Sequence, residues 1–285
     1  YTIFTGMMLV QLFYWGTNQQ IIQRALAAKD LKEGQKGLLL ASFIKILGPL
    51  IVVLPGLIAY HIFEGNLESA DSAYPMLVKK VLPTAWVGFF AAVLFGAILS
   101  SFNSVLNSSV TLFGLDIYKQ HINKDANEKT IVKYGKTFGV LLAIAAMFIA
   151  PLIANAGSLF DYLQKVNGIY SIPILTIIIV GYTTKYVPAI AAKIGLFSGC
   201  LLYITYMLID IYSPEVFSRL HFLDICAILF ILNILIMLII GYFKPREEAY
   251  VQEYTKQVDI TPWKYLKPVS IAICLIVIGV YIYFT

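Results

Sequence analysis

One apolar stretch of the sequence, FGAILSSFNSVLNSSVTLFGLDIYK, carries a row of hydroxyl and amide side chains at the spacing of a single helix face. With about 100° of rotation per residue, the row occupies an arc of about 160°. Hydroxyl and carbonyl oxygens are ligands that hard cations prefer, and the row reaches no carboxylate before Asp116. It therefore favours a monovalent cation such as sodium over a divalent one. Its members are Ser100, Ser101, Asn103, Ser104, Asn107, Ser108 and Thr111.

The row also has a purely structural interpretation, which the sequence leaves open. Small polar side chains often line contacts between membrane helices, and Ser and Thr hydroxyls donate to the carbonyl of the preceding turn. In that case the hydroxyls would be satisfied within the helix and would not be available to an ion.

A second group combines an amide with two aromatic rings. Gln11, Tyr14 and Trp15 stand at i, i+3 and i+4, so on a helix they share a face. An amide can bind sugar hydroxyls while an aromatic ring covers the apolar face of the sugar. The alternative is that Tyr14 and Trp15 are membrane-interface residues.

Two further polar side chains lie within apolar runs. Lys45, in the string LLLASFIKILGPL, stands about nine residues into the expected span 37–60, roughly 12 Å along a helix. Because that span is expected to continue uninterrupted on both sides, we expect Lys45 to face a polar cavity rather than to snorkel to the interface. Gln164 is a candidate ligand group or an interhelical hydrogen-bonding residue, and the nearby Asp161 and Lys165 are spaced to pair with each other.

The composition indicates what must hold these residues. The chain has 285 residues, of which 59% are hydrophobic and 13% charged, whereas soluble domains carry roughly 25% charged residues. Its mean hydropathy is +0.80. These values predict an all-α integral membrane protein and exclude a soluble enzyme, a nucleic-acid-binding protein and a disordered chain. The three Cys and three His residues share no metal-ligand spacing, and we expect no enzymatic activity.

We expect about eight transmembrane helices. Lys and Arg are concentrated in alternate loops, which places the first, third, fifth and seventh loops in the cytoplasm. Both ends of the chain would then lie outside, which indicates that further spans precede residue 1. The expected spans are 1–21, 37–60, 86–117, 134–154, 159–182, 188–212, 221–242 and 268–284.

Four strings of the sequence together resemble the solute:sodium symporter family, with the greatest likeness to its bacterial sodium/galactose symporter and the animal sodium/glucose relatives. They are FYWGTNQQIIQRALAAK, FIKILGPLIVVLPG, GAILSSFNSVLNSSVTLFGLDIYKQH and LFDYLQKVNG. The resemblance implies the leucine-transporter type of fold, in which two inverted five-helix repeats enclose a site at the midplane of the membrane. Residues 1–182 would be the second repeat, and residues 183–285 would be three peripheral helices with a polar cytoplasmic loop at 243–267. The first repeat, absent from this sequence, would be the partner of the second.

The resemblance also implies roles for single residues. For sodium, Ala97 would supply a backbone carbonyl, and Ser100 and Ser101 would supply hydroxyls. Asn103 and Ser104 occupy a turn that some relatives use for a second sodium ion, an alternative that stays open.

For the sugar, the resemblance implies that Lys45 and Gln164 hydrogen-bond hydroxyl groups. Tyr14 would close over the sugar from the cytoplasmic side, with Trp15 beside it. Gln11 stands where the galactose symporter has an asparagine, so it keeps the amide but has a longer reach.

The function that we expect is sodium-coupled symport of a hexose such as galactose or glucose, by alternating access, in a bacterial inner membrane. The alternatives are symport of another small solute (sialic acid, inositol, proline or an anion) and a membrane sensor module.

Overall fold

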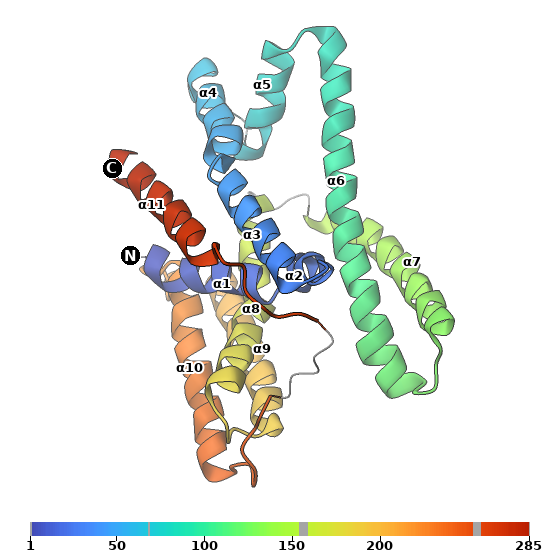
Figure 1. Ribbon diagram of the computed structural model, residues 1–285. Helices are drawn as coiled ribbons and strands as arrows, with labels where there is room; N and C mark the ends of the chain where they lie inside the picture. The colour runs from blue at the N-terminus through green and yellow to red at the C-terminus, as the bar shows by residue number, and fades with distance from the viewer. Residues whose placement is uncertain (1, 68, 154–158, 253–257, 285) are drawn as a thin grey trace. The chain divides into compact units, whose positions relative to one another are not determined.

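The computed structural model describes residues 2–67, 69–153, 159–252 and 258–284, and all the regular elements in these ranges are helices (Figure 1). Seven helices in the described ranges are long and apolar enough to cross a membrane. The chain is therefore an all-α, multi-pass membrane protein, as the composition predicted. The seven are Leu31–Ile62, Thr84–Ile122, Glu128–Ile153, Asp161–Thr183, Ala189–Tyr212, Phe222–Phe243 and Leu266–Tyr283.

The first expected span, residues 1–21, is not one long helix in the structure. A π-helical segment and helix α1 together give only a shorter apolar helix, Ile3–Gly16. The helix ends there because the Thr17 hydroxyl donates to the Phe13 carbonyl at 2.9 Å, and the Asn18 side chain accepts from the backbone N–H of Gln20 at 3.0 Å. Asn at this position caps the next helix. The elements are η1 (Ile3–Met7), α1 (Met8–Gly16) and α2 (Gln19–Leu26).

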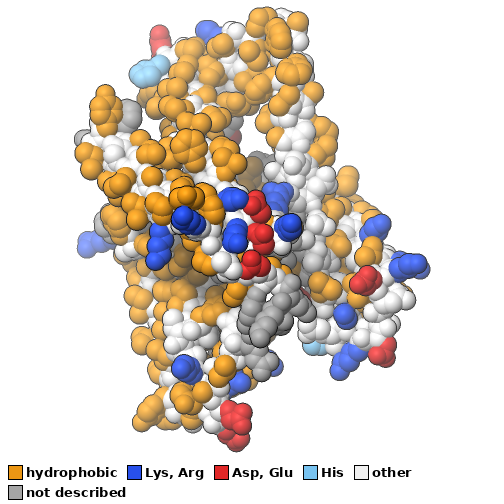
Figure 2. All heavy atoms as spheres, viewed as in Figure 1, with side chains coloured by type: hydrophobic (Ala, Val, Ile, Leu, Met, Phe, Trp, Pro, Cys, Tyr) orange, Lys and Arg blue, Asp and Glu red, His pale blue; other side chains and the backbone are white. Residues whose placement is uncertain are grey.

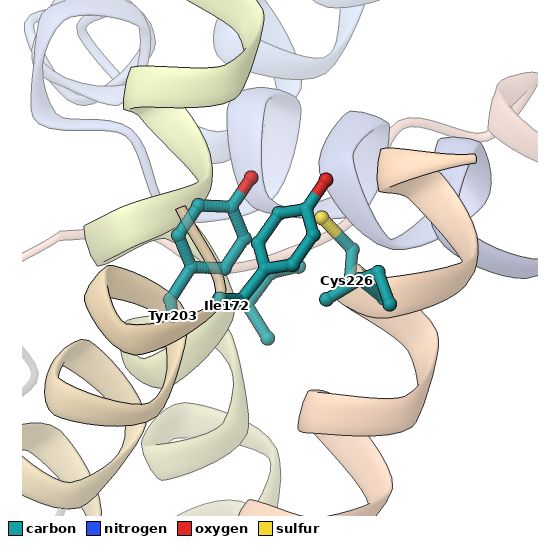
Figure 3. Packing of buried hydrophobic residues seen from close by; sticks show 5 residues of the cluster. Ile172, Tyr203 and Cys226 are labelled. Carbon is teal, nitrogen blue, oxygen red and sulfur yellow. The ribbon is translucent and has the colours of Figure 1, made fainter. Parts of the chain in front are cut away.

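The contacts divide the chain into two compact units. Unit 1 comprises Tyr1–Ile22 and Phe160–Gln257. Its core lies where side chains of α8, α9 and α10 meet, and Figure 3 shows Ile172, Tyr203 and Cys226 packed together there. The long helices of this unit are α8 (Leu159–Thr183, which begins one residue before the unit), α9 (Ala189–Tyr212) and α10 (Phe222–Phe243).

The N-terminal segment joins unit 1 through a very close backbone contact. A Cβ atom placed on Gly6 would lie 1.9 Å from the carbonyl oxygen of Leu223, at the start of α10. Because the neighbour is backbone, it cannot rotate out of the way, and only glycine fits. This contact positions α1, which follows directly.

We therefore expect Gly6→Ala in the whole protein to lower the free energy of unfolding by about 1–3 kcal/mol, the usual range for overpacking. Thermal unfolding in detergent measures the change. Gly181→Ala is the matched control, because Gly181 has no neighbour within 4 Å of its added Cβ. Equal melting temperatures for the two variants would contradict the close contact.

Unit 2 comprises Gln23–Leu159 and Val258–Thr285. Its longest element is α6, which continues through the π-helical segment η4 and turns back along α7 (Figure 1). The rings of Phe113 and Phe138 stack at 4.2 Å across this pair. The helices are α3 (Leu31–Lys45), η2 (Pro49–Val53), α4 (Leu54–Ile62), η3 (Ala70–Ser72), α5 (Ala73–Val81), α6 (Thr84–Leu112), η4 (Phe113–Ile122), α7 (Glu128–Ile153) and α11 (Leu266–Phe284).

Figure 2 shows that hydrophobic side chains cover most of the visible surface and that charged side chains gather in a few patches. This distribution suits helices that contact lipid along their length and water only at their ends.

Candidate ion and substrate site

The polar row on α6 divides into two parts that differ in the hydrogen bonds of their hydroxyl groups. From Ser104 onward, the hydroxyls donate to carbonyls four residues earlier: Ser104 to Ser100 at 2.9 Å, Ser108 to Ser104 at 2.9 Å, and Thr111 to Asn107 at 2.8 Å. The structural interpretation of the row is therefore confirmed for this part, because these hydroxyls are satisfied within the helix.

Ser100 and Ser101 differ from the rest of the row. Both are exposed in the structure, and within the part of the chain that it describes neither hydroxyl makes a hydrogen bond. Ala97, one turn earlier, is also exposed. In a membrane helix an unsatisfied hydroxyl is costly unless another group or an ion binds it.

Helix α2 contacts α6 directly beyond these serines. The Arg24 guanidinium donates to the Ser104 hydroxyl, and the Ser108 hydroxyl donates to the Gln23 side-chain oxygen at 3.4 Å. Helical spacing could not indicate this role of Arg24, because its partner lies 80 residues away in the sequence. A second sodium ion at Asn103 and Ser104 stays a prediction, and it would have to bind beside this positive charge, which repels it.

In unit 1, α1 packs on α8 through Phe13. This ring is buried and meets the Tyr170 ring edge-on at 5.8 Å, and the Tyr170 hydroxyl donates to the Asn167 side chain at 2.6 Å. With Phe13 turned inward, Gln11 and Tyr14 stay exposed.

The aromatic pair expected on α1 is present. The Tyr14 and Trp15 rings lie 5.4 Å apart at 83°. The Gln11 amide is within 3.8 Å of the Met7 sulfur, a weak contact that a sugar hydroxyl could replace.

Gln164 is half-buried on α8. Next to it, Lys165 forms an ion pair with Asp210 of α9, with 3.0 Å between nitrogen and oxygen. The spacing rule suggested Asp161 as the partner of Lys165. Asp210 was missed because the rule covers only pairs within one helix. This ion pair holds the α8 turn that carries Gln164 against α9.

Lys45 lies within a span that is helical from Leu31 to Ile62, so the span continues on both sides of this residue, but its helical geometry changes there. It is the last residue of α3, and the next two residues form a tighter turn, with Ile46 donating to Phe43 and Leu47 to Ile44. The tighter turn follows from Pro49, which has no N–H to donate to the Lys45 carbonyl.

The predicted site residues fall in both units. Unit 1 holds Gln11, Tyr14, Trp15 and Gln164, on two helices in contact. Unit 2 holds Lys45, Ala97, Ser100, Ser101, Asn103 and Ser104.

The chain is similar to known transporters over most of its length. A profile of the sodium:solute symporter family matches residues 2–199. The uncharacterized symporter YidK of Escherichia coli (strain K12) is 47% identical over 279 residues, which is 98% of this chain and 48% of that protein.

The names of some relatives state a solute, and two of these relatives show the range. The sodium/glucose cotransporter of Vibrio parahaemolyticus is 40% identical, over 67% of this chain and 38% of that protein. The human sodium/myo-inositol cotransporter 2 is 30% identical, over 88% of this chain and 41% of that protein. The chain thus spans less than half the length of these relatives.

Proposed function

The chain belongs to the sodium:solute symporter family, and on that premise we propose that it is part of a symporter that couples sodium entry to uptake of a hexose. The protein would lie in the bacterial inner membrane, with residues 1–182 as its second five-helix repeat and 183–285 as peripheral helices. A first repeat would complete both the ion site and the sugar site. Transport needs no covalent step, so the proposal assigns no catalytic residue.

One observation carries the sodium site. On a face where the later hydroxyls are bonded within the helix, Ser100 and Ser101 alone keep their hydroxyls available in the described chain. With the Ala97 carbonyl they offer three oxygens. A sodium ion needs about six, so the first repeat would supply the others. Sodium is a carried ion here, bound and released in each cycle.

The sugar site combines the amide of Gln11, the rings of Tyr14 and Trp15, and the hydrogen-bonding groups of Lys45 and Gln164. This set suits a ring with several hydroxyl groups, because it offers donors, acceptors and an apolar cover. Coupling follows if sodium favours the state that binds the sugar, since each ligand then strengthens binding of the other.

Uptake into proteoliposomes tests the proposal. The whole protein, given an inward sodium gradient, should accumulate labelled galactose or glucose. An excess of unlabelled hexose should compete, whereas proline, sialic acid and iodide should not. Competition by myo-inositol alone would assign the site to cyclitols, and sodium-dependent uptake of none of these solutes would refute the proposal.

Arg24 gives a further prediction. The guanidinium contacts Ser104, one helical turn after Ser100. A sodium ion bound at Ser100 would lie roughly 8 Å from this positive charge, which would repel it. We expect Arg24→Gln to lower the sodium concentration for half-maximal uptake by about two- to fivefold.

Arg24→Lys keeps the charge and should leave sodium dependence near that of the wild type. Lys29→Gln, on the loop after α2, is the control for a general loss of positive charge. If Arg24→Gln and Lys29→Gln change sodium dependence equally, the specific effect of Arg24 is excluded.

A further inference from the structure

The segment before α11 is held against the beginning of α3, within unit 2. The backbone N–H of Leu31 donates to the Asp259 carbonyl at 3.1 Å, and the N–H of Trp263 donates to the Gln35 side chain at 2.7 Å. Lys32 also lies 3.7 Å from the Asp259 carboxylate. The first and seventh loops, both expected in the cytoplasm, therefore meet at the same ends of two spans.

Asp259 keeps its charge in this arrangement. The Thr261 hydroxyl donates to its carboxylate at 2.5 Å and the Thr261 backbone N–H at 2.8 Å. These hydrogen bonds hold the pKa of Asp259 below its ordinary value. The Asp259 carboxylate therefore stays ionised to a lower pH than an ordinary aspartate.

Beyond this contact, α3 and α11 line an open apolar groove of about 650 Å³. Leu40 and Phe43 line it from α3, and Ala272 and Ile273 line it from α11. Lys36 and Trp263 lie at the end where the two loops meet. The groove is thus polar at one end and apolar along the rest of its length.

The polar end carries an excess of positive charge. Residues 29–36 and 259–267 contain five lysines and three carboxylates. Figure 2 shows positive and negative side chains gathered near the start of α3. Lys36 lies 6.0 Å over the Trp263 ring and pairs with Glu33 at 2.6 Å. Lys264 lies 5.5 Å over the Tyr265 ring. The lysines are Lys29, Lys32, Lys36, Lys264 and Lys267.

This combination of features matches one class of ligand. Basic pockets between transmembrane helices on the cytoplasmic side bind anionic lipid head groups, and Trp and Tyr are enriched at that depth. An apolar groove within the membrane is filled by hydrocarbon rather than water, because water there would lack polar partners. A free phosphate would use the lysines and leave the groove empty.

We propose that the groove between α3 and α11 binds one anionic glycerophospholipid, with an acyl chain between Phe43 and Ile273 and the phosphate at Lys36 and Lys264. The site shares no residue with the proposed ion and sugar sites and does not depend on the transported solute. The lipid fixes the position of α11 on α3 by joining their apolar faces.

Native mass spectrometry of the whole protein tests this site. After purification in mild detergent and addition of phosphatidylglycerol or phosphatidylethanolamine, the wild type should retain one phosphatidylglycerol preferentially. The double variant Lys36→Gln, Lys264→Gln should lower its retention about tenfold or more. Lys124→Gln with Lys129→Gln, in the loop between α6 and α7, is the matched control and should retain the lipid.

A second variant tests the acyl part of the site. Ala272→Trp fills the groove without changing charge, and it should also lose phosphatidylglycerol. Ala145→Trp, on an exposed position of α7, should not. Glycerol 3-phosphate in excess should leave the bound lipid in place.

Three results would overturn the proposal. They are equal retention in the lysine variants and their control, retention in Ala272→Trp, and displacement of the lipid by glycerol 3-phosphate. Sodium-dependent uptake is measured separately, so failure of this site leaves the proposed transport function untouched.

Discussion

Replacing Ser101 by alanine in the whole protein should raise the sodium concentration for half-maximal uptake about tenfold or more. The reason is that a hydroxyl oxygen bound to a charged partner contributes about 1.5–3 kcal/mol, and each 1.4 kcal/mol is about a factor of ten in affinity. The Ser101 hydroxyl makes no hydrogen bond within the described chain, so no intrahelical contact is lost with it. Sodium titration of uptake in proteoliposomes measures the change.

Ser109→Ala is the control on the same helix. The Ser109 hydroxyl donates to the Val105 carbonyl at 3.0 Å, so it is already satisfied and should not bind sodium. We expect its sodium dependence to match that of the wild type. If Ser101→Ala also matches the wild type, sodium does not bind at this turn of α6.

The second large effect is expected at Lys45. Lys45→Ala should weaken sugar binding about tenfold or more, by loss of a charged hydrogen-bonding group, while the melting temperature changes little. Lys45 is exposed at the end of α3, where the next two residues form a tighter helical turn. Sugar titration of uptake, together with thermal unfolding, separates binding from stability.

Lys193→Ala is the matched control, since Lys193 is an exposed lysine within the apolar helix α9. It should leave sugar dependence unchanged. A Lys45→Ala protein with normal uptake and a raised melting temperature would show instead that Lys45 is a snorkelling residue, whose removal relieves a cost.

The long spans could be predicted from composition and hydropathy alone. Seven of the eight expected spans coincide with long apolar helices in the described residues. The prediction works because a bilayer demands about 20 apolar residues per helix. It fails for 1–21, where Thr17 and Asn18 hydrogen-bond to nearby backbone groups and divide the segment. Residues of this kind compete with helical hydrogen bonds.

The polar row on α6 shows what a helical pattern in the sequence can predict and what it cannot. The pattern placed Ser100 and Ser104 on one face but did not separate a free hydroxyl from a satisfied one. That distinction depends on local geometry and on Arg24, which comes from another helix. Helix periodicity predicts which residues are neighbours within one helix. Contacts between residues of different helices are known only once the packing of the helices is known.

The sequence by itself determined the class of this protein, the approximate spans and the residue types available for an ion and a sugar. Local rules are sufficient for these, because hydropathy and helical spacing act within about 20 residues. Only the tertiary structure decided that Lys165 pairs with Asp210, that Arg24 binds Ser104, and that α3 and α11 line a groove. Each of these contacts joins residues more than 40 positions apart, and chain folding rather than local preference brings them together.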